Sequence, residues 1–387
     1  MSKPVFYQSI GPQLWWHDID VDGAALTRQS SVTIAGANVQ YVWPHPSKKY
    51  LYVVSSDGGP GTIPGTKHVA TAFRIDPVSG ALKFNGGHTR LPSRPVHCSV
   101  DHAGRHLLTA YNYPSNITVH RLNTDGTIGE EVPPRDKLDV GIFAHQVLTT
   151  PGDRTAIMVT RGNNAAPGRP EDPGALKVYG FNDGALSNLA SIARGNGLGF
   201  GPRHLDFHPD KPWVFLSVER QSELHVYRLN DDGTLPGEAA FIKSALIDRI
   251  NHTPTQMAGA IHVHPNGRFV YMTNRNSGTE GVDGRKVFKG GENNVAVFSI
   301  DQETGEPALI QNIDATTNHL RTFAIDPSGR LLIAASIQPM AMRDGSTLPA
   351  ALVLYRIGPD GRLSFARKYD VDVGRFMQFW SGIITLP

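Results

Sequence analysis

Short apolar segments recur along the whole chain and are separated by turn residues. Clear examples are YLYVVSS at 50–56, WVFLSVE at 213–219 and FVYMTNR at 269–275. Each segment is shorter than an ordinary helix and is bounded by residues such as Gly, Pro, Asp and Ser, which is typical of β-strands. The pattern therefore predicts an all-β chain built from many short strands.

These strands belong to a repeating unit of four. A turn precedes the apolar strand, and a third strand, a second turn and a fourth strand follow it. The second residue of the first turn falls at positions 46, 102, 151, 209, 265 and 327, so the period is about 55 residues. This repeat predicts a β-propeller of four-stranded blades, whereas a pair of antiparallel sandwiches is the alternative for an all-β chain of this length.

Two segments lie outside the six complete units. Residues 14–26 have the pattern of a third strand, a turn and a fourth strand, and residues 373–386 have the pattern of the first two strands. Joined, they make a seventh blade that is closed by both ends of the chain, which leaves no open sheet edge. We therefore expect a single seven-bladed propeller domain over residues 1–387.

The composition restricts the class of partner. The chain has 387 residues with a formal net charge of +2, and no run of Lys or Arg exceeds two residues. This does not favour a nucleic-acid or membrane-surface partner, and the apolar runs are too short to span a bilayer. The single cysteine, Cys98, excludes an intrachain disulfide, and the first residues lack a secretory signal. We expect a soluble cytoplasmic protein.

Charged and polar residues gather at two positions of the repeat. One is the expected start of the innermost strand, and the other is the expected end of the second strand, so the two are neighbours at one end of an antiparallel sheet. The residues are His145, Arg203 and Arg321 at the first position, and Asn112, Arg161, Glu219 and Arg275 at the second. Buried arginine and glutamate carry a desolvation cost that partners or a ligand must offset. The pattern predicts a binding site beside the central channel.

Histidines add candidates close to the first position. They are His97, His204 and His262. For His204, a structural bond to a neighbouring blade is the alternative. His262 alternates with His264, but His264 occupies a turn, so we do not expect the pair to share a metal ion. His45 and His208 occupy the same turn position and are expected to be structural. No cluster has good metal-ligand spacing, and we expect neither a metal nor another cofactor.

Three long polar loops follow second strands, at residues 162–174, 277–292 and 339–349. Loops in this position emerge on the same face of a propeller as the charged residues. Long loops in a compact fold are commonly functional, so these three predict a lid or a wall around a central pocket.

Several segments resemble the seven-bladed lactonase family, which includes propeller-type 6-phosphogluconolactonases and 3-carboxy-cis,cis-muconate lactonizing enzymes. The segments are GPRHLDFHPDKPWVFLSVERQSELHVYRL, HVHPNGRFVYMTNRNS and HLRTFAIDPSGRLLIAAS. The resemblance implies that His145, Arg203, Glu219 and Arg275 surround the channel mouth, as the corresponding residues do in the muconate branch. Arg161 and the longer rim loops depart from the short gluconolactonase type.

Lactone opening requires an activated water, a cationic site for the developing oxyanion and a proton for the leaving alkoxide. We expect His145 to transfer the proton, Glu219 to orient His145 or hold the water, and Arg203 and Arg275 to clamp an anion. The remaining candidates for substrate binding are Arg161, His97, His204, His262, Arg321 and Asn112. The expected function is hydrolysis of a small lactone that carries a carboxylate or phosphate.

Three alternatives remain open at the level of the sequence. A muconate-type cycloisomerase would form the lactone instead and would need the same arginines with a proton donor. A non-catalytic propeller would bind a protein partner through its rim. At the level of single residues, Arg203 and Arg275 could simply bridge neighbouring blades through Glu219.

Overall fold

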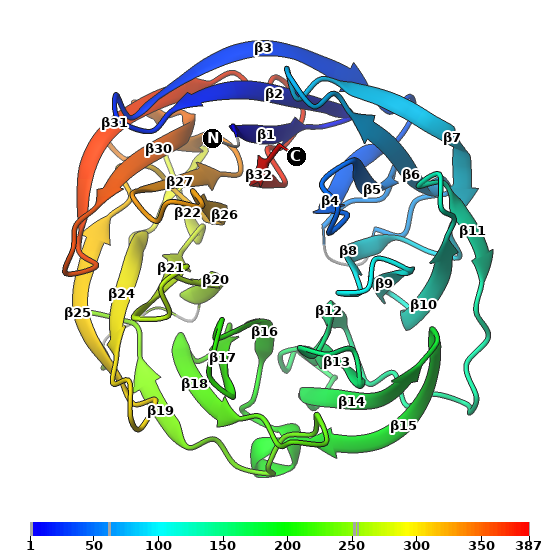
Figure 1. Cartoon of the computed structure of the whole chain (residues 1–387). Coiled ribbons are helices and arrows are strands. Elements are labelled where there is room, and N and C mark those ends of the chain that lie inside the picture. Colours follow the sequence, from blue (N-terminus) through cyan, green and yellow to red (C-terminus); the bar gives the residue numbers. More distant parts are fainter. Residues whose placement is uncertain (1–2, 61–62, 251–252, 254, 387) are drawn as a thin grey trace.

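Seven four-stranded antiparallel sheets are arranged in a ring, with their strands stacked outward from a common axis (Figure 1). The computed structural model describes residues 3–60, 63–250, 253 and 255–386. The seven-bladed propeller predicted from the repeat is confirmed.

Six blades are continuous in the sequence. From the innermost to the outermost strand, the first two blades consist of β4 (Asn38–Pro44), β5 (Tyr50–Ser56), β6 (His68–Ile75) and β7 (Leu82–Arg90), and of β8 (Pro95–Val100), β9 (His106–Asn112), β10 (Ser115–Leu122) and β11 (Ile128–Glu131). The next two consist of β12 (Ala144–Thr149), β13 (Thr155–Thr160), β14 (Ala175–Asn182) and β15 (Ala185–Ile192), and of β16 (Pro202–Phe207), β17 (Trp213–Val218), β18 (Glu223–Arg228) and β19 (Phe241–Ser244). The last two consist of β20 (Met257–Val263), β21 (Phe269–Arg275), β24 (Asn294–Ile300) and β25 (Pro307–Asp314), and of β26 (Leu320–Ile325), β27 (Leu331–Ser336), β30 (Ala350–Ile357) and β31 (Leu363–Val371). A short 3₁₀ turn, η1 (Arg194–Gly197), is also present.

The seventh blade joins both ends of the chain, as predicted, but its strands are shared differently. From the innermost strand outward, it consists of β32 (Ser381–Thr385), β1 (Pro4–Ile10), β2 (Gln13–Asp20) and β3 (Ala25–Thr33). The expectation that residues 373–386 supply two strands is wrong, because only β32 pairs there. The N-terminal strand β1 takes the second place and pairs with both β2 and β32. Residues 373–380 form a connection instead, which is buried at its last three residues, and the carbonyl groups of Met377 and Trp380 accept hydrogen bonds from the amides of Gly11 and Ser9.

Neighbouring blades pack through their apolar faces. Every residue of the second strand β17 is buried, because the preceding blade covers one face of the sheet and the following blade covers the other. The outermost strand β7 is mostly exposed. The hydrophobic clusters accordingly lie between adjacent blades, so the ring as a whole forms the core.

Polar contacts between blades also repeat around the ring. The turn histidines each bond through Nε2 to the carbonyl oxygen of a glycine in the next blade. The pairs are His45 with Gly104 at 2.8 Å, His208 with Gly267 at 3.0 Å and His264 with Gly329 at 2.9 Å. The prediction that His45 and His208 are structural is confirmed.

Two of the three long loops carry hairpins of their own. These are β22 (Thr279–Val282) with β23 (Arg285–Phe288), and β28 (Met340–Ala341) with β29 (Thr347–Leu348). The two hairpins contact each other, and Arg343 forms an ion pair with Glu280 between them. They form one continuous wall beside the ends of β21 and β27. Among the described residues, no helix is long and apolar enough to cross a membrane.

Candidate active site

Glu219 lies at the centre of a group of arginines. It follows β17 directly and is only 1% exposed. Its Oε2 accepts a hydrogen bond from Arg161 Nη1 at 2.8 Å, and its Oε1 lies 3.1 Å from Arg203 Nε and accepts a bond from Arg275 Nη2. Arg161, Arg203, Glu219 and Arg275, here called the Glu219 group, therefore meet from three neighbouring blades. All four residues occupy the two repeat positions that the sequence analysis singled out.

The Glu219 group carries more positive than negative charge. Burial alone would raise the pKa of Glu219, but Arg161, Arg275 and Arg203 outweigh it and hold this pKa well below its usual range. Burial, followed by the neighbouring Arg275, lowers the pKa of Arg203 to about 9. One carboxylate serves three guanidinium groups, so the group attracts a further anion.

A row of histidines continues from Arg203 into the channel. Arg203 Nη1 lies 3.2 Å from His204 Nδ1, and the ring of His204 lies 5.0 Å from that of His145 in a T-shaped arrangement. Burial, followed by the charge of Arg203, lowers the pKa of His145 well below its usual range. His145 is therefore neutral at neutral pH, and its Nδ1 has no hydrogen-bond partner among the described residues.

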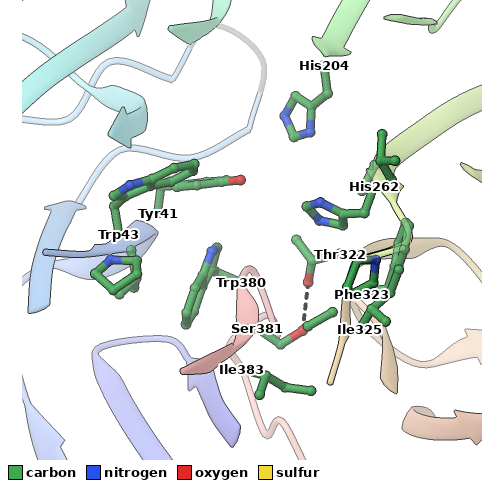
Figure 2. Close-up of a pocket in the computed structure, with 17 residues that line it drawn as sticks. Tyr41, Trp43, His204, His262, Thr322, Phe323, Ile325, Trp380, Ser381 and Ile383 are labelled. Atoms are coloured by element: carbon green, nitrogen blue, oxygen red, sulfur yellow. Dashed lines mark hydrogen bonds between the residues drawn. The ribbon is translucent and has the colours of Figure 1, made fainter. Parts of the chain in front are cut away.

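A cavity of about 330 Å³ inside the channel is lined by His204 and His262, whereas His145 and the Glu219 group do not line it. Figure 2 shows His204 and His262 projecting toward it, with Tyr41 and Trp380 on the opposite side. His262 also lies with Nδ1 3.5 Å from Asp206 Oδ2. His204 therefore contacts Arg203 and the cavity, and the alternative of a bond to a neighbouring blade is not what the structure shows.

The other predicted residues lie around the same mouth. His97 is buried, its Nδ1 lies 3.5 Å from the amide nitrogen of Val147 in the next blade, and its ring lies 6.0 Å from that of His204. Arg321 lies on β26 with its guanidinium 3.6 Å above the ring of Phe379. Asn112 is the last residue of β9, where it is buried. His264 bonds to Gly329, so it does not share a site with His262.

The sequence did not identify three other residues of the mouth. His319 lies with Nε2 3.2 Å from Arg275 Nη1, and Arg94 donates two hydrogen bonds to Gln40. Arg94 and His319 lie just before the strands β8 and β26, outside the two repeat positions. The third is Arg220, which forms an ion pair with Glu171 at 2.7 Å and so ties the loop 162–174 to the end of β17. In the sequence, His319 and Arg94 are marked only by their place directly before a strand, in the pairs His319-Leu320 and Arg94-Pro95.

Fold and site together define a propeller enzyme with a buried, arginine-rich mouth. The family model described as "Lactonase, 7-bladed beta-propeller" matches residues 13–338. The chain belongs to this family of lactonases, which confirms the resemblance of its repeated segments, and it is an enzyme of the lactone-hydrolase type.

Relatives with assigned names agree with this assignment. The chain is 26% identical over 323 residues to a 6-phosphogluconolactonase of Bacillus subtilis, covering 82% of each chain. It is 29% identical over 304 residues to a 6-phosphogluconolactonase of Cronobacter sakazakii, covering 79% of each. The periplasmic gluconolactonase PpgL of Pseudomonas aeruginosa shares the fold, with a TM-score of 0.70, 18% identity and 99% coverage of both chains. These names give no support to the cycloisomerase alternative.

Proposed function

We propose that the protein hydrolyses a phosphorylated sugar lactone of the 6-phosphogluconolactone type to its open-chain acid. The observation that carries this proposal is the Glu219 group, in which the buried Arg203 and Arg275 and the half-buried Arg161 share one carboxylate. The surplus positive charge suits a reaction that turns a neutral ester into a carboxylate. Two relatives that are named 6-phosphogluconolactonase and align over about four fifths of the chain support the substrate class.

In the proposed mechanism, His145 carries the proton. Its neutral imidazole takes a proton from a water molecule, and the water oxygen forms a bond to the lactone carbonyl carbon. Arg203 stabilises the negative charge that develops on the carbonyl oxygen, and Arg275 binds the lactone end of the substrate in the ground state and the transition state alike. The tetrahedral intermediate then breaks the ring carbon–oxygen bond, and the imidazolium returns the proton to the leaving alkoxide. This general acid–base route uses no metal ion.

Glu219 takes a positioning role in this scheme. Both of its oxygens are already held by arginines, and its recorded hydrogen bonds involve Arg161 and Arg275. We therefore assign Glu219 to orienting the arginines toward the carbonyl oxygen, in place of the expected role of orienting His145 or holding the water. The contact that orients His145 in this scheme is instead the ring of His204, which packs against it.

The test compares two lactones that differ only in the phosphate. The purified protein is assayed by acid release with 6-phosphoglucono-δ-lactone and with glucono-δ-lactone, at fixed pH and salt and after correction for spontaneous hydrolysis. We expect kcat/KM to be at least about tenfold higher for the phosphorylated lactone, since a charge-assisted contact is lost without the phosphate. Equal rates for the two lactones, or no catalysis of the phosphorylated one, would contradict the proposal. Lactone formation from 3-carboxy-cis,cis-muconate would favour the cycloisomerase.

Arg275→Ala tests the anion clamp. Arg275 binds the substrate and the transition state alike in this scheme, so its loss is expected to raise KM by about 10-fold or more and to lower kcat less. Calorimetric titration with 6-phosphogluconate should show weaker binding. The matched control is Arg268→Ala, because Arg268 is an exposed arginine at the other end of the same strand and stacks near Phe269. A fall in kcat with unchanged KM and product affinity would show that Arg275 acts in the chemical step only.

A further inference from the structure

We propose that Arg94 and Arg321 form a second anion subsite at the channel mouth, which binds the phosphate of the substrate while the Glu219 group faces the lactone carbonyl. This assignment rests on the proposed function and adds to it the place of each end of the substrate.

Arg94 is a buried arginine, and its hydrogen-bond partner among the described residues is a neutral amide. It directly precedes β8 and is 3% exposed. Its Nε and Nη2 both donate to Oε1 of Gln40, at 3.0 and 2.8 Å. Burial lowers the pKa of Arg94 to about 10. Among the described residues no carboxylate forms an ion pair with it, so its charge is solvated only by an amide.

Arg321 is a second guanidinium without a carboxylate among the described residues. Its Nε donates to the carbonyl oxygen of Phe379 at 3.1 Å, and its Cζ lies 3.6 Å from the centre of the Phe379 ring. The Cζ of Arg94 lies 5.8 Å from the centre of the same ring, so one phenyl group borders both cations. Burial, and then the charges of Arg203, Arg275 and Arg94, lower the pKa of Arg321 well below its usual range.

The contacts of this pair do not offset its charge. A cation–π contact recovers only part of the free energy that is lost when a guanidinium leaves water. A position that served packing alone would favour a neutral side chain of similar length. The buried guanidinium of Arg94 and the half-buried guanidinium of Arg321 border one ring, and the terminal nitrogens of Arg321 have no hydrogen-bond partner among the described residues. The pair therefore forms a site for an anion that takes two-point contacts. Phosphate has this chemistry.

The pair and the Glu219 group come from different blades of the ring. Figure 1 shows β8, β4, β32 and β26, which carry or adjoin Arg94, Gln40, Phe379 and Arg321, along one arc, whereas the Glu219 group comes from the blades of β13, β17 and β21 on the remaining arc. In 6-phosphoglucono-δ-lactone the carbonyl carbon and the carbon that carries the phosphomethyl group are both bonded to the ring oxygen, so the phosphate and the carbonyl are a few bonds apart. The phosphate can therefore bind at this pair while the carbonyl faces Arg275, which lies in the blade next to that of Arg321.

The test uses Arg94→Gln, Arg321→Gln and the double variant, with Arg28→Gln as a matched control. Arg28 also stacks on an aromatic ring, 3.3 Å from that of Trp15, but it is exposed on the outermost strand β3. We expect the double variant to lower kcat/KM for the phosphorylated lactone by about 100-fold and to leave the value for glucono-δ-lactone within about threefold. Its affinity for 6-phosphogluconate should fall, and its Tm should not, because uncompensated buried charges are removed.

Each outcome decides a different claim. An equal loss for both lactones, or a large fall in Tm, would overturn the subsite and leave the proposed function standing. If the parent protein does not hydrolyse the phosphorylated lactone, the proposed function fails, and calorimetry alone decides the subsite. In that case, phosphate-dependent binding of 6-phosphogluconate that is lost in the variants supports it, whereas absent binding overturns it. If the double variant does not fold, the two single variants provide the same comparison.

Discussion

Replacing His145 by alanine is expected to lower kcat by about 10²–10⁴-fold, the usual loss when a general acid–base group is removed. His145 is 8% exposed, neutral at neutral pH because of burial and the nearby Arg203, and has an Nδ1 without a described partner. It is therefore able to accept a proton from water. The variant should still bind 6-phosphogluconate, because the arginines remain. The measurement is turnover together with calorimetric titration of this product.

The pH profile gives an independent check on His145. Since the pKa of His145 lies well below the usual value of 6.5, the imidazole is neutral at neutral pH. We therefore expect kcat/KM to decline only as the pH falls through this lowered pKa, well below 6.5. The control variant is His88→Ala, which removes an exposed histidine from the outermost strand β7. If His145→Ala keeps more than about a tenth of the parental turnover, another group carries the proton.

Glu219→Gln is expected to lower the free energy of unfolding by about 3–5 kcal/mol, the usual cost of removing one partner from a buried ion pair. The neutral amide would leave the buried Arg203 and Arg275, and the half-buried Arg161, without a counter-charge. Chemical denaturation of the parent and the variant at pH 7 measures this difference. The control is Glu130→Gln on the exposed strand β11. A change in stability no larger than that of the control would show that the arginines do not depend on Glu219.

The stabilisation by Glu219 has a defined pH range. Its pKa in the folded protein is held well below the usual value of 4.5 by the neighbouring arginines, so folding favours the ionised form. The contribution is complete above the pKa of the unfolded chain and is lost as the pH falls through the lower pKa of the folded state. The difference in stability between parent and variant should thus be constant near neutrality and shrink only in acid.

The repeat explains why much of the site was predictable. A propeller places equivalent residues of each unit at equivalent points around the axis, so a column in the aligned units is a ring in space. Arg203, Glu219 and Arg275 occupy such columns, and they meet as the columns predict. The same argument identified His45 and His208 as structural, because they occupy the same turn position of the repeat.

The remaining features depend on contacts that a column does not encode. Arg94 lies outside the repeat positions and bonds to Gln40 of the preceding blade. It borders Phe379 because the C-terminal segment closes the last blade. That closure was itself only partly predicted. The segment 373–386 has enough apolar residues for two strands, but β1 pairs with β32 and displaces it from the second place. Pairing across the termini is set by the whole ring, and local pattern does not reveal it.

The closure of the last blade also affects how the enzyme matures. Phe379 borders both Arg94 and Arg321, Trp380 lines the cavity, and β32 directly follows them near the end of the chain. During synthesis on a ribosome, these residues emerge after the other blades have been made. A nascent chain, or one trimmed by a protease before residue 379, lacks one side of the mouth even when most blades are present. The proposed second anion subsite is therefore complete only when the ring has closed.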